Sequence, residues 1–203
     1  MQKWNRRKDE RPLEIMLAAV DLFVTNGFVS TKIDDIAKKA GVSKGTIYLY
    51  YSSKESLFKA MVHDLMLPKI KLVEDFISTY EGSQLELLRI VILQWWVTVK
   101  ESGLTGVPKL IMTEADKFPD LTKLYVKEVI HRVQAILINI ISSGIKEQHI
   151  REIDPILSSR VIMSSLVYFS MWHTTLRKFD QKGLKVENLI EQQIDILING
   201  IQK

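Results

Sequence analysis

The chain has 203 residues, enough for one large or two small domains with a sizeable core. Hydrophobic residues make up 46% of it and charged residues 26%, which are ordinary values for a globular protein. The absence of cysteine excludes a disulfide framework and a thiolate metal site, and agrees with a reducing cytoplasm. We expect no signal peptide, because no apolar stretch follows the charged start. We also expect no membrane span, because charged residues interrupt every apolar run of about 18 residues.

The net charge of +4 is concentrated near the N-terminus. Residues 1–66 hold eleven Lys or Arg against eight Asp or Glu, whereas residues 67–203 hold seventeen against sixteen. Five basic residues lie within the first eleven positions: Lys3, Arg6, Arg7, Lys8 and Arg11. Such an arm could follow a DNA backbone or enter a minor groove. The alternative is a solvated tail, since charge runs are usually just solvated.

The first helix is predicted from Pro12 to Asn26. Proline suits the first turn of a helix, and apolar residues recur at helical spacing as far as Val24. Asn26 and Gly27 form the stop signal. We expect this helix to be a scaffold against which the next two helices pack.

Residues 31–54 predict two short helices joined by a tight turn. The first has one apolar face, formed by Ile33, Ile36, Ala37 and Ala40. Thr31 stands where its N-cap belongs, with Asp34 three residues further on. Gly41 should end it with a positive φ, and Ser43 should cap the second helix.

The second short helix begins with small, polar and positively charged residues. They are Lys44, Gly45 and Thr46. A nearly bare helix start of this kind suits close approach to phosphate. Ile47 can point inward while Tyr48 and Tyr50 project away from the packed side. This is the layout of a helix-turn-helix whose second helix enters the major groove of DNA.

A fourth helix should follow, opened by a capping box of Ser52 and Glu55. Pro68 should kink or end it. The domain boundary is therefore placed here, with domains at residues 1–66 and 67–203.

The remainder predicts helix after helix, with no strand pattern bounded by hairpin signals. The expected helices cover about 85–102, 107–117, 121–145, 155–178 and 186–201. Asp154-Pro155 is an especially clear helix start. The fold class is all-α, with about nine helices: a three-helix helix-turn-helix domain followed by a larger bundle.

A family resemblance rests on residues between 11 and 60, and most densely on Gly41 to Phe58. The matching positions are Gly27-Phe28, Thr31, Ile36-Ala37, Ala40-Gly41-Val42, Ser43-Lys44-Gly45-Thr46-Ile47-Tyr48, Tyr51 and Ser53-Lys54-Glu55-Ser56-Leu57-Phe58. This signature resembles that of the TetR (tetracycline-repressor) family. Its members are all-helical, homodimeric transcriptional regulators that respond to small molecules.

The resemblance implies DNA-contacting residues. Gly45 and Tyr48 correspond to groove-facing positions. The implied phosphate contacts are Thr31, Ser43, Lys44, Thr46, Tyr50 and Lys54. Thr46 could instead touch a thymine methyl group. Tyr48 or Tyr50 could instead pack against the first helix, and Tyr51 is expected to do so.

The resemblance also implies a ligand-binding and dimerisation domain. Candidate pocket residues are Trp95, Trp96, Met112, Phe118, Tyr125, Phe169, Trp172 and His173. Aromatic and methionine side chains suit an apolar or aromatic effector, although any one of them could simply be core. Helices 155–178 and 186–201 are the expected homodimer interface, and the second is apolar over more than one face. The alternative is burial of that helix on two sides within one subunit.

No catalytic or metal-binding constellation is predicted, and no cofactor. The four histidines are scattered. Glu128 and His131 match half of a di-iron site, but no second copy exists.

The expected function is a cytoplasmic, non-enzymatic transcriptional regulator. As a repressor, its dimer would bind a palindromic operator and be released by a largely apolar effector. The alternatives are a ligand-independent activator, or a helical bundle without DNA function.

Overall fold

The computed structural model describes residues 2–180, 183 and 185–203, with residues 2–9 by their backbone alone. These residues form nine continuous helical segments, three of which contain a π-helical turn. The described residues contain no β-strand, only an isolated bridge between Ile150 and Gln202. The all-α prediction is therefore confirmed. No helix in the described part of the chain combines the length and apolar character needed to cross a membrane.

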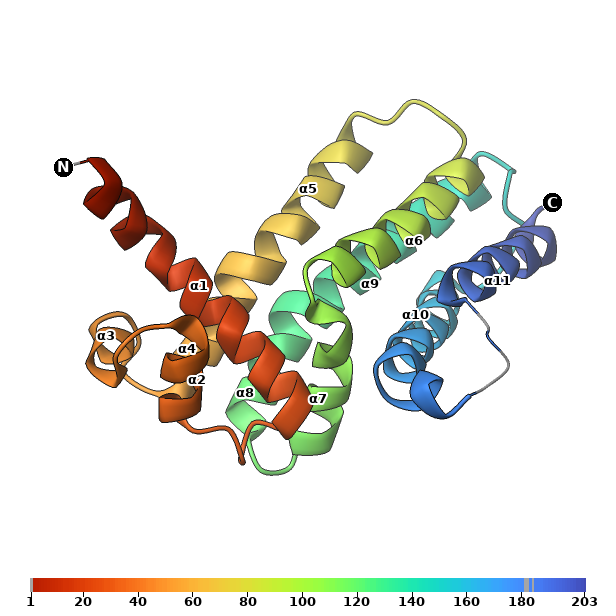
Figure 1. Cartoon of the computed structure of the whole chain (residues 1–203). Helices are drawn as coiled ribbons and strands as arrows, with labels where there is room; N and C mark the ends of the chain where they lie inside the picture. The colour runs from red at the N-terminus through yellow and green to blue at the C-terminus, as the bar shows by residue number, and fades with distance from the viewer. Residues whose placement is uncertain (1, 181–182, 184) are drawn as a thin grey trace.

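The N-terminal head consists of the first four helices, in which α2 to α4 lie beside α1 (Figure 1). Their bounds are α1 (Gln2–Asn26), α2 (Ile33–Ala40), α3 (Lys44–Tyr50) and α4 (Lys54–Met61). Ile15, Ala19 and Phe23 follow one another at four-residue spacing on α1 and are fully buried. The scaffold role predicted for the first helix is confirmed.

The beginning of α1 differs from the prediction. The helix starts at Gln2 rather than Pro12, and Pro12 lies inside it. A proline ring removes one backbone hydrogen bond, but residues 2–11 are mostly good helix formers that continue the helix beyond it. The basic side chains of Lys3, Arg6, Arg7 and Lys8 lie outside the described side chains.

Two predicted caps are displaced by one residue. The N-cap of α2 is Lys32, whose backbone N–H donates to the Asp35 carboxylate at 3.3 Å. The N-cap of α4 is Ser53, which exchanges hydrogen bonds with Ser56 at 2.9 and 3.1 Å. At both places the sequence offers capping groups in two adjacent registers, and the path of the preceding loop selects between them.

The bundle follows α4 without a break. Its helices are α5 (Leu67–Ser78), α6 (Gln84–Glu101), α7 (Val107–Glu114), α8 (Pro119–Tyr125), α9 (His131–Lys146), α10 (Pro155–Met171) and α11 (Val186–Ile201). A π-helical turn, Val62–Met66, joins α4 to α5, so Pro68 lies in the first turn of α5 and the helix continues through it. A second π turn, Val126–Ile130, joins α8 to α9. The domain boundary after residue 66 stays a prediction.

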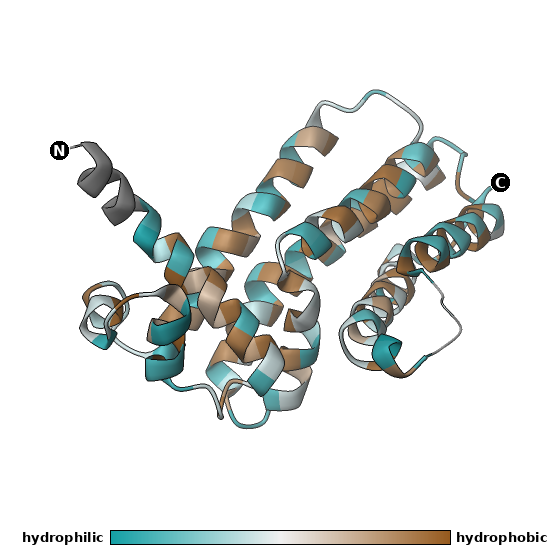
Figure 2. Ribbon diagram, viewed as in Figure 1, coloured by the Kyte–Doolittle hydropathy of each residue, from teal (hydrophilic) through white to brown (hydrophobic). Residues whose placement is uncertain are grey.

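Two apolar cores hold the structure together. The core of the head extends into the bundle through Leu104, Val107, Leu110 and Leu121. The second core lies among α5, α6, α9, α10 and α11. Hydrophobic and hydrophilic bands alternate along the bundle helices, as Figure 2 shows. Because α7 and α8 contribute to the first core, the head is packed directly on the bundle.

Candidate nucleic-acid interface and effector cavity

The turn between α2 and α3 has the predicted geometry. Gly41 adopts φ +65°, the left-handed conformation that glycine reaches without strain. The N–H of Val42 donates to the Ala37 carbonyl at 3.0 Å, which closes the end of α2. Ser43 then accepts a hydrogen bond from the N–H of Thr46 at 3.0 Å, which caps α3. These local bonds fix the direction in which α3 leaves the turn.

The two faces of α3 are clearly separated. Ile47 is fully buried, and Tyr51 packs inward with its hydroxyl donating to the Pro12 carbonyl at 3.3 Å. Tyr48 is 48% exposed and Tyr50 36%. The inward and outward positions predicted from helical periodicity are confirmed. Leu49, between Tyr48 and Tyr50 on the outward face of α3, is 83% exposed and was not predicted as a surface residue.

Gly45 lies exposed in the first turn of α3. A Cβ atom added there would meet only Ser43 Oγ, at 3.7 Å, which is an ordinary contact. Glycine in a helix costs about 0.5–1 kcal/mol relative to alanine, and here neither φ nor steric crowding requires it. The missing side chain at Gly45 therefore leaves exposed backbone that a partner molecule can approach closely.

The polar side chains at the start of α3 make contacts with one another and with the neighbouring α2. Lys44 Nζ contacts the Asp34 carboxylate at 2.8 Å, and this hydrogen bond raises the pKa of Lys44. Ser43 and Thr46 share a hydrogen bond of 2.8 Å between their hydroxyl groups. Exposed ion pairs contribute little to stability, so a phosphate group can compete for Lys44.

Thr31 does not lie on this surface. Its side chain is 1% exposed, and its hydroxyl donates to the carbonyls of Gly27 at 2.7 Å and Leu22 at 3.1 Å. This placement gives no support to a phosphate contact by Thr31. The hydroxyl instead ties the loop after α1 to the end of that helix.

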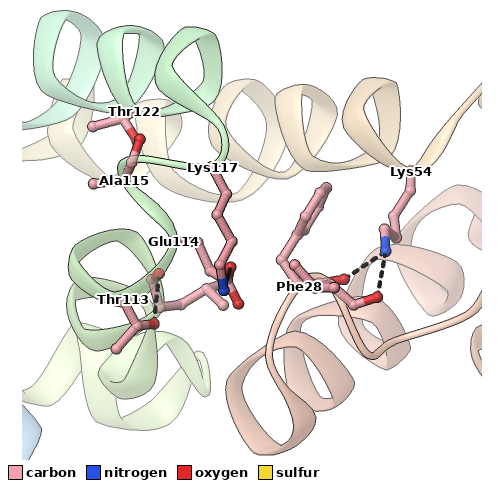
Figure 3. A network of polar contacts seen from close by, with 9 residues as sticks. Phe28, Lys54, Thr113, Glu114, Ala115, Lys117 and Thr122 are labelled. Carbon is pink, nitrogen blue, oxygen red and sulfur yellow. Dashed lines mark hydrogen bonds and ion pairs between the residues drawn. The ribbon is translucent and has the colours of Figure 1, made fainter.

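Lys54 is also used inside the fold. Its ammonium group donates to the carbonyls of Phe28 at 2.5 Å, Thr31 at 2.9 Å and Val29 at 3.2 Å, and it lies 4.6 Å from the centre of the Phe28 ring. Figure 3 shows the ammonium directed at this loop, with Glu114 at the end of α7 and Lys117 in the turn that follows it. Burial lowers the pKa of Lys54. The three donors of the ammonium are occupied, so Lys54 holds the loop between α1 and α2.

Replacing Lys54 by methionine should destabilise the protein by about 1–3 kcal/mol, because the carbonyls of the loop lose a charged donor. Urea unfolding measures this loss. Lys59→Met, at an exposed site on the same helix, is the matched control and should change stability by less than about 0.5 kcal/mol. A phosphate contact would predict the opposite result: unchanged stability and a shallower salt dependence of DNA binding.

The bundle contains an apolar cavity of about 210 Å³ that is partly open to solvent. Helices α5, α6, α7, α9 and α10 contribute most of its wall, together with the π turn after α8. Of the predicted pocket residues, Trp95, Met112 and Tyr125 line it. Apart from the indole N–H of Trp95, its polar groups belong to Lys69, Thr98 and Tyr125.

The other predicted pocket residues lie elsewhere. Trp96 and Trp172 are buried in the second core, and Phe169 packs against it. His173 stands edge-on to Trp96, with ring centroids 5.3 Å apart. Phe118 packs against Phe28 in the first core, with ring centroids 4.6 Å apart. Their aromatic character reflects packing needs, which composition cannot distinguish from a pocket wall.

The outer side of α10 and α11 is unusually apolar. Leu157, Val161 and Tyr168 are spaced by four and seven residues on α10, so they share one face, and all are more than half exposed. Ile196 on α11 is 65% exposed.

Asp154 caps α10 by accepting from the N–H groups of Ile156 and Leu157, as the sequence predicted.

An exposed, capped second helix on a head joined to a helical bundle defines the class of helix-turn-helix transcriptional regulators. Residues 15–61 match the family model for bacterial regulatory proteins of the tetR family. The predicted resemblance to the TetR family is therefore confirmed, and the family model covers the helix-turn-helix region.

Full-length relatives include regulators of fatty acid metabolism. The fatty acid metabolism regulator protein of Bacillus subtilis is 25% identical over 198 residues, which cover 96% of this chain and 98% of that protein. The structure of the transcriptional regulator FadR from Bacillus subtilis in complex with stearoyl-CoA matches with a TM-score of 0.72 and 27% identity, covering 94% and 99% of the two chains. A ketosteroid transcriptional regulator of Mycobacterium tuberculosis shares the fold, with a TM-score of 0.75, 20% identity and 95% coverage of both chains.

Proposed function

We propose that this protein is a cytoplasmic, non-enzymatic repressor whose dimer binds a palindromic operator and is released by an acyl-CoA. The observation that carries the DNA-binding part is α3, which presents Lys44, Gly45 and Tyr48 outward from a rigid, capped turn. Tyr48 and the Gly45 backbone would face base edges. Ser43, Lys44, Thr46 and Tyr50 would meet phosphates, because hydroxyl and ammonium groups suit such contacts.

Homodimerisation would use the exposed apolar face of α10 and α11. Leu157, Val161 and Tyr168 lie on one face of α10, with Ser164 and Ser165 in the turn between the last two, and exposed apolar side chains grouped in this way mark interaction surfaces. Two copies joined there would carry two α3 helices. To meet successive major grooves, these helices must lie about 34–36 Å apart.

The effector would place its apolar part in the bundle cavity. The volume of about 210 Å³ exceeds the roughly 150 Å³ that accepts benzene in an engineered apolar cavity. The wall is almost wholly apolar, and the opening would let a longer chain or a polar head continue outward. A related regulator is bound to stearoyl-CoA, whose acyl chain has this chemistry.

One helical rod links the two sites. The segment Lys54–Ser78 begins in the head at α4, and its second half supplies Met66, Ile70 and Val73 to the cavity wall. A ligand that displaces α5 would therefore move α4 and the head with it. By linkage, such a ligand must lower DNA affinity by the same factor by which DNA lowers ligand affinity.

The test is fluorescence anisotropy of the full-length protein with DNA from upstream of its own coding sequence, with and without stearoyl-CoA. We expect binding of a two-fold symmetric site as a dimer, weakened about 5- to 150-fold by stearoyl-CoA. Failure to bind any upstream sequence would contradict the regulator proposal. Operator affinity that is unchanged by bound stearoyl-CoA would contradict release by acyl-CoA and favour a ligand-independent regulator.

A further inference from the structure

The polar groups of the cavity differ in what they already contact. Thr98 accepts a hydrogen bond from Gln94 at 3.3 Å. Lys69 is half-buried on α5, where water can still reach its ammonium group. Tyr125 is different, because its side chain is 7% exposed and its hydroxyl hydrogen-bonds to none of the described residues.

The Tyr125 hydroxyl is not fully enclosed, so water or a ligand in the partly open cavity can reach it. An apolar ligand that displaces this water leaves the donor unpaired, at a cost of about 1–3 kcal/mol in proteins. A ligand that offers an oxygen acceptor at this point avoids that cost. Burial raises the pKa of Tyr125 to about 12, so the phenol stays protonated at neutral pH and remains available as a donor.

The position of Tyr125 places this donor between the two candidate sites. Tyr125 ends α8 and lies directly before the π turn Val126–Ile130, which supplies Val129 and Ile130 to the cavity wall. Its ring belongs to the core of the head, together with Leu121. A ligand that bonds to this hydroxyl would therefore touch the apolar core that supports α1 and α4.

We infer that the Tyr125 hydroxyl selects effectors that carry an oxygen acceptor on their apolar part, and that in an acyl-CoA it donates to the thioester carbonyl. This inference rests on the proposed acyl-CoA effector. It makes Tyr125 a specificity-determining residue: an apolar molecule of equal size without the acceptor would leave the hydroxyl unpaired and bind less tightly. The carbonyl would gain a neutral donor in an apolar surrounding, where hydrogen bonds are stronger than in water.

The test is isothermal titration of the full-length protein with stearoyl-CoA and with S-octadecyl-CoA, the thioether that lacks the carbonyl oxygen. The wild type should bind the thioester about five-fold more tightly, in line with the net worth of one hydrogen bond. Tyr125→Phe should bring this ratio close to one while leaving thioether affinity unchanged. Tyr80→Phe is the matched control, because Tyr80 lies on no wall of the cavity, and it should keep the wild-type ratio.

The outcomes separate this inference from the function on which it rests. A ratio near one in the wild type, or a ratio that survives in Tyr125→Phe, would overturn the role of Tyr125 while leaving an acyl-CoA effector intact. If the wild type binds neither compound, the acyl-CoA effector itself is wrong, and the inference falls with it. Urea unfolding of Tyr125→Phe checks that the fold survives, and we expect its stability to be close to that of the wild type.

Discussion

Replacing Tyr48 by alanine should reduce operator affinity about 5- to 150-fold per half-site, the scale of one lost base contact of about 1–3 kcal/mol. The side chain is half-exposed on the outward face of α3, so its loss removes little packing within the chain. Anisotropy titrations with the upstream DNA measure the affinity. Thermal unfolding should be nearly unchanged, which would separate a lost contact from a lost fold.

Two further variants make this result specific. Gly45→Ala should leave stability equal or slightly higher, because alanine favours helices and the new methyl group meets only Ser43 Oγ. It should nevertheless weaken DNA binding, since the methyl group stands where the helix must approach the duplex. Leu72→Ala, at an exposed site on α5, should affect neither property. Operator affinity that survives both Tyr48→Ala and Gly45→Ala would show that α3 is not the recognition helix.

Replacing Phe28 by alanine should destabilise the protein by about 3–5 kcal/mol, the usual cost of emptying a buried aromatic site. Phe28 is 2% exposed, and its ring lies 4.9 Å from Phe23, 6.0 Å from Phe58 and 4.6 Å from Phe118. These partners come from α1, from α4 and from the residue before α8. Phe28 is thus the aromatic side chain through which the loop after α1 joins the head to the bundle.

Urea unfolding, followed by tryptophan fluorescence, measures this loss. Val29→Ala is the neighbouring control, since Val29 is half-exposed and should change stability by less than about 0.5 kcal/mol. The head and the bundle should unfold in a single transition at the lower urea concentration, because residues of both contribute to the first core. A loss below about 1 kcal/mol, or separate unfolding of an intact bundle, would contradict this view of the junction.

The local structure of the recognition helix could be predicted because each signal acts within a few residues. Gly41 permits a left-handed turn, Ser43 bonds to an N–H three residues away, and helical periodicity separates Ile47 from Tyr48. None of these effects needs information from a distant part of the chain. At two other helix starts the predicted N-cap was one residue too early: the N-caps are Lys32 and Ser53 rather than Thr31 and Ser52.

The uses of Thr31 and Lys54 could not be predicted in this way. Thr31 donates to the carbonyls of Gly27 and Leu22, at and before the end of α1. Lys54 donates to carbonyls of the loop after α1, more than twenty residues away in sequence. Which group a long side chain reaches depends on how α1, α2 and α4 come together. The residues of the cavity wall could not be predicted from the sequence either. Trp95 lines the cavity whereas the adjacent Trp96 is buried in the second core, because the two side chains leave α6 in different directions.

The helical class, the turn and exposed face of α3, and the resemblance to the TetR family could be read from the sequence alone, because they follow from spacing and from short-range hydrogen bonds. Only the tertiary structure showed which polar residues remain available to a partner, which aromatic residues surround a cavity, and that Tyr125 lines that cavity. The physical reason is that burial and hydrogen-bond satisfaction depend on groups brought together from distant parts of the chain.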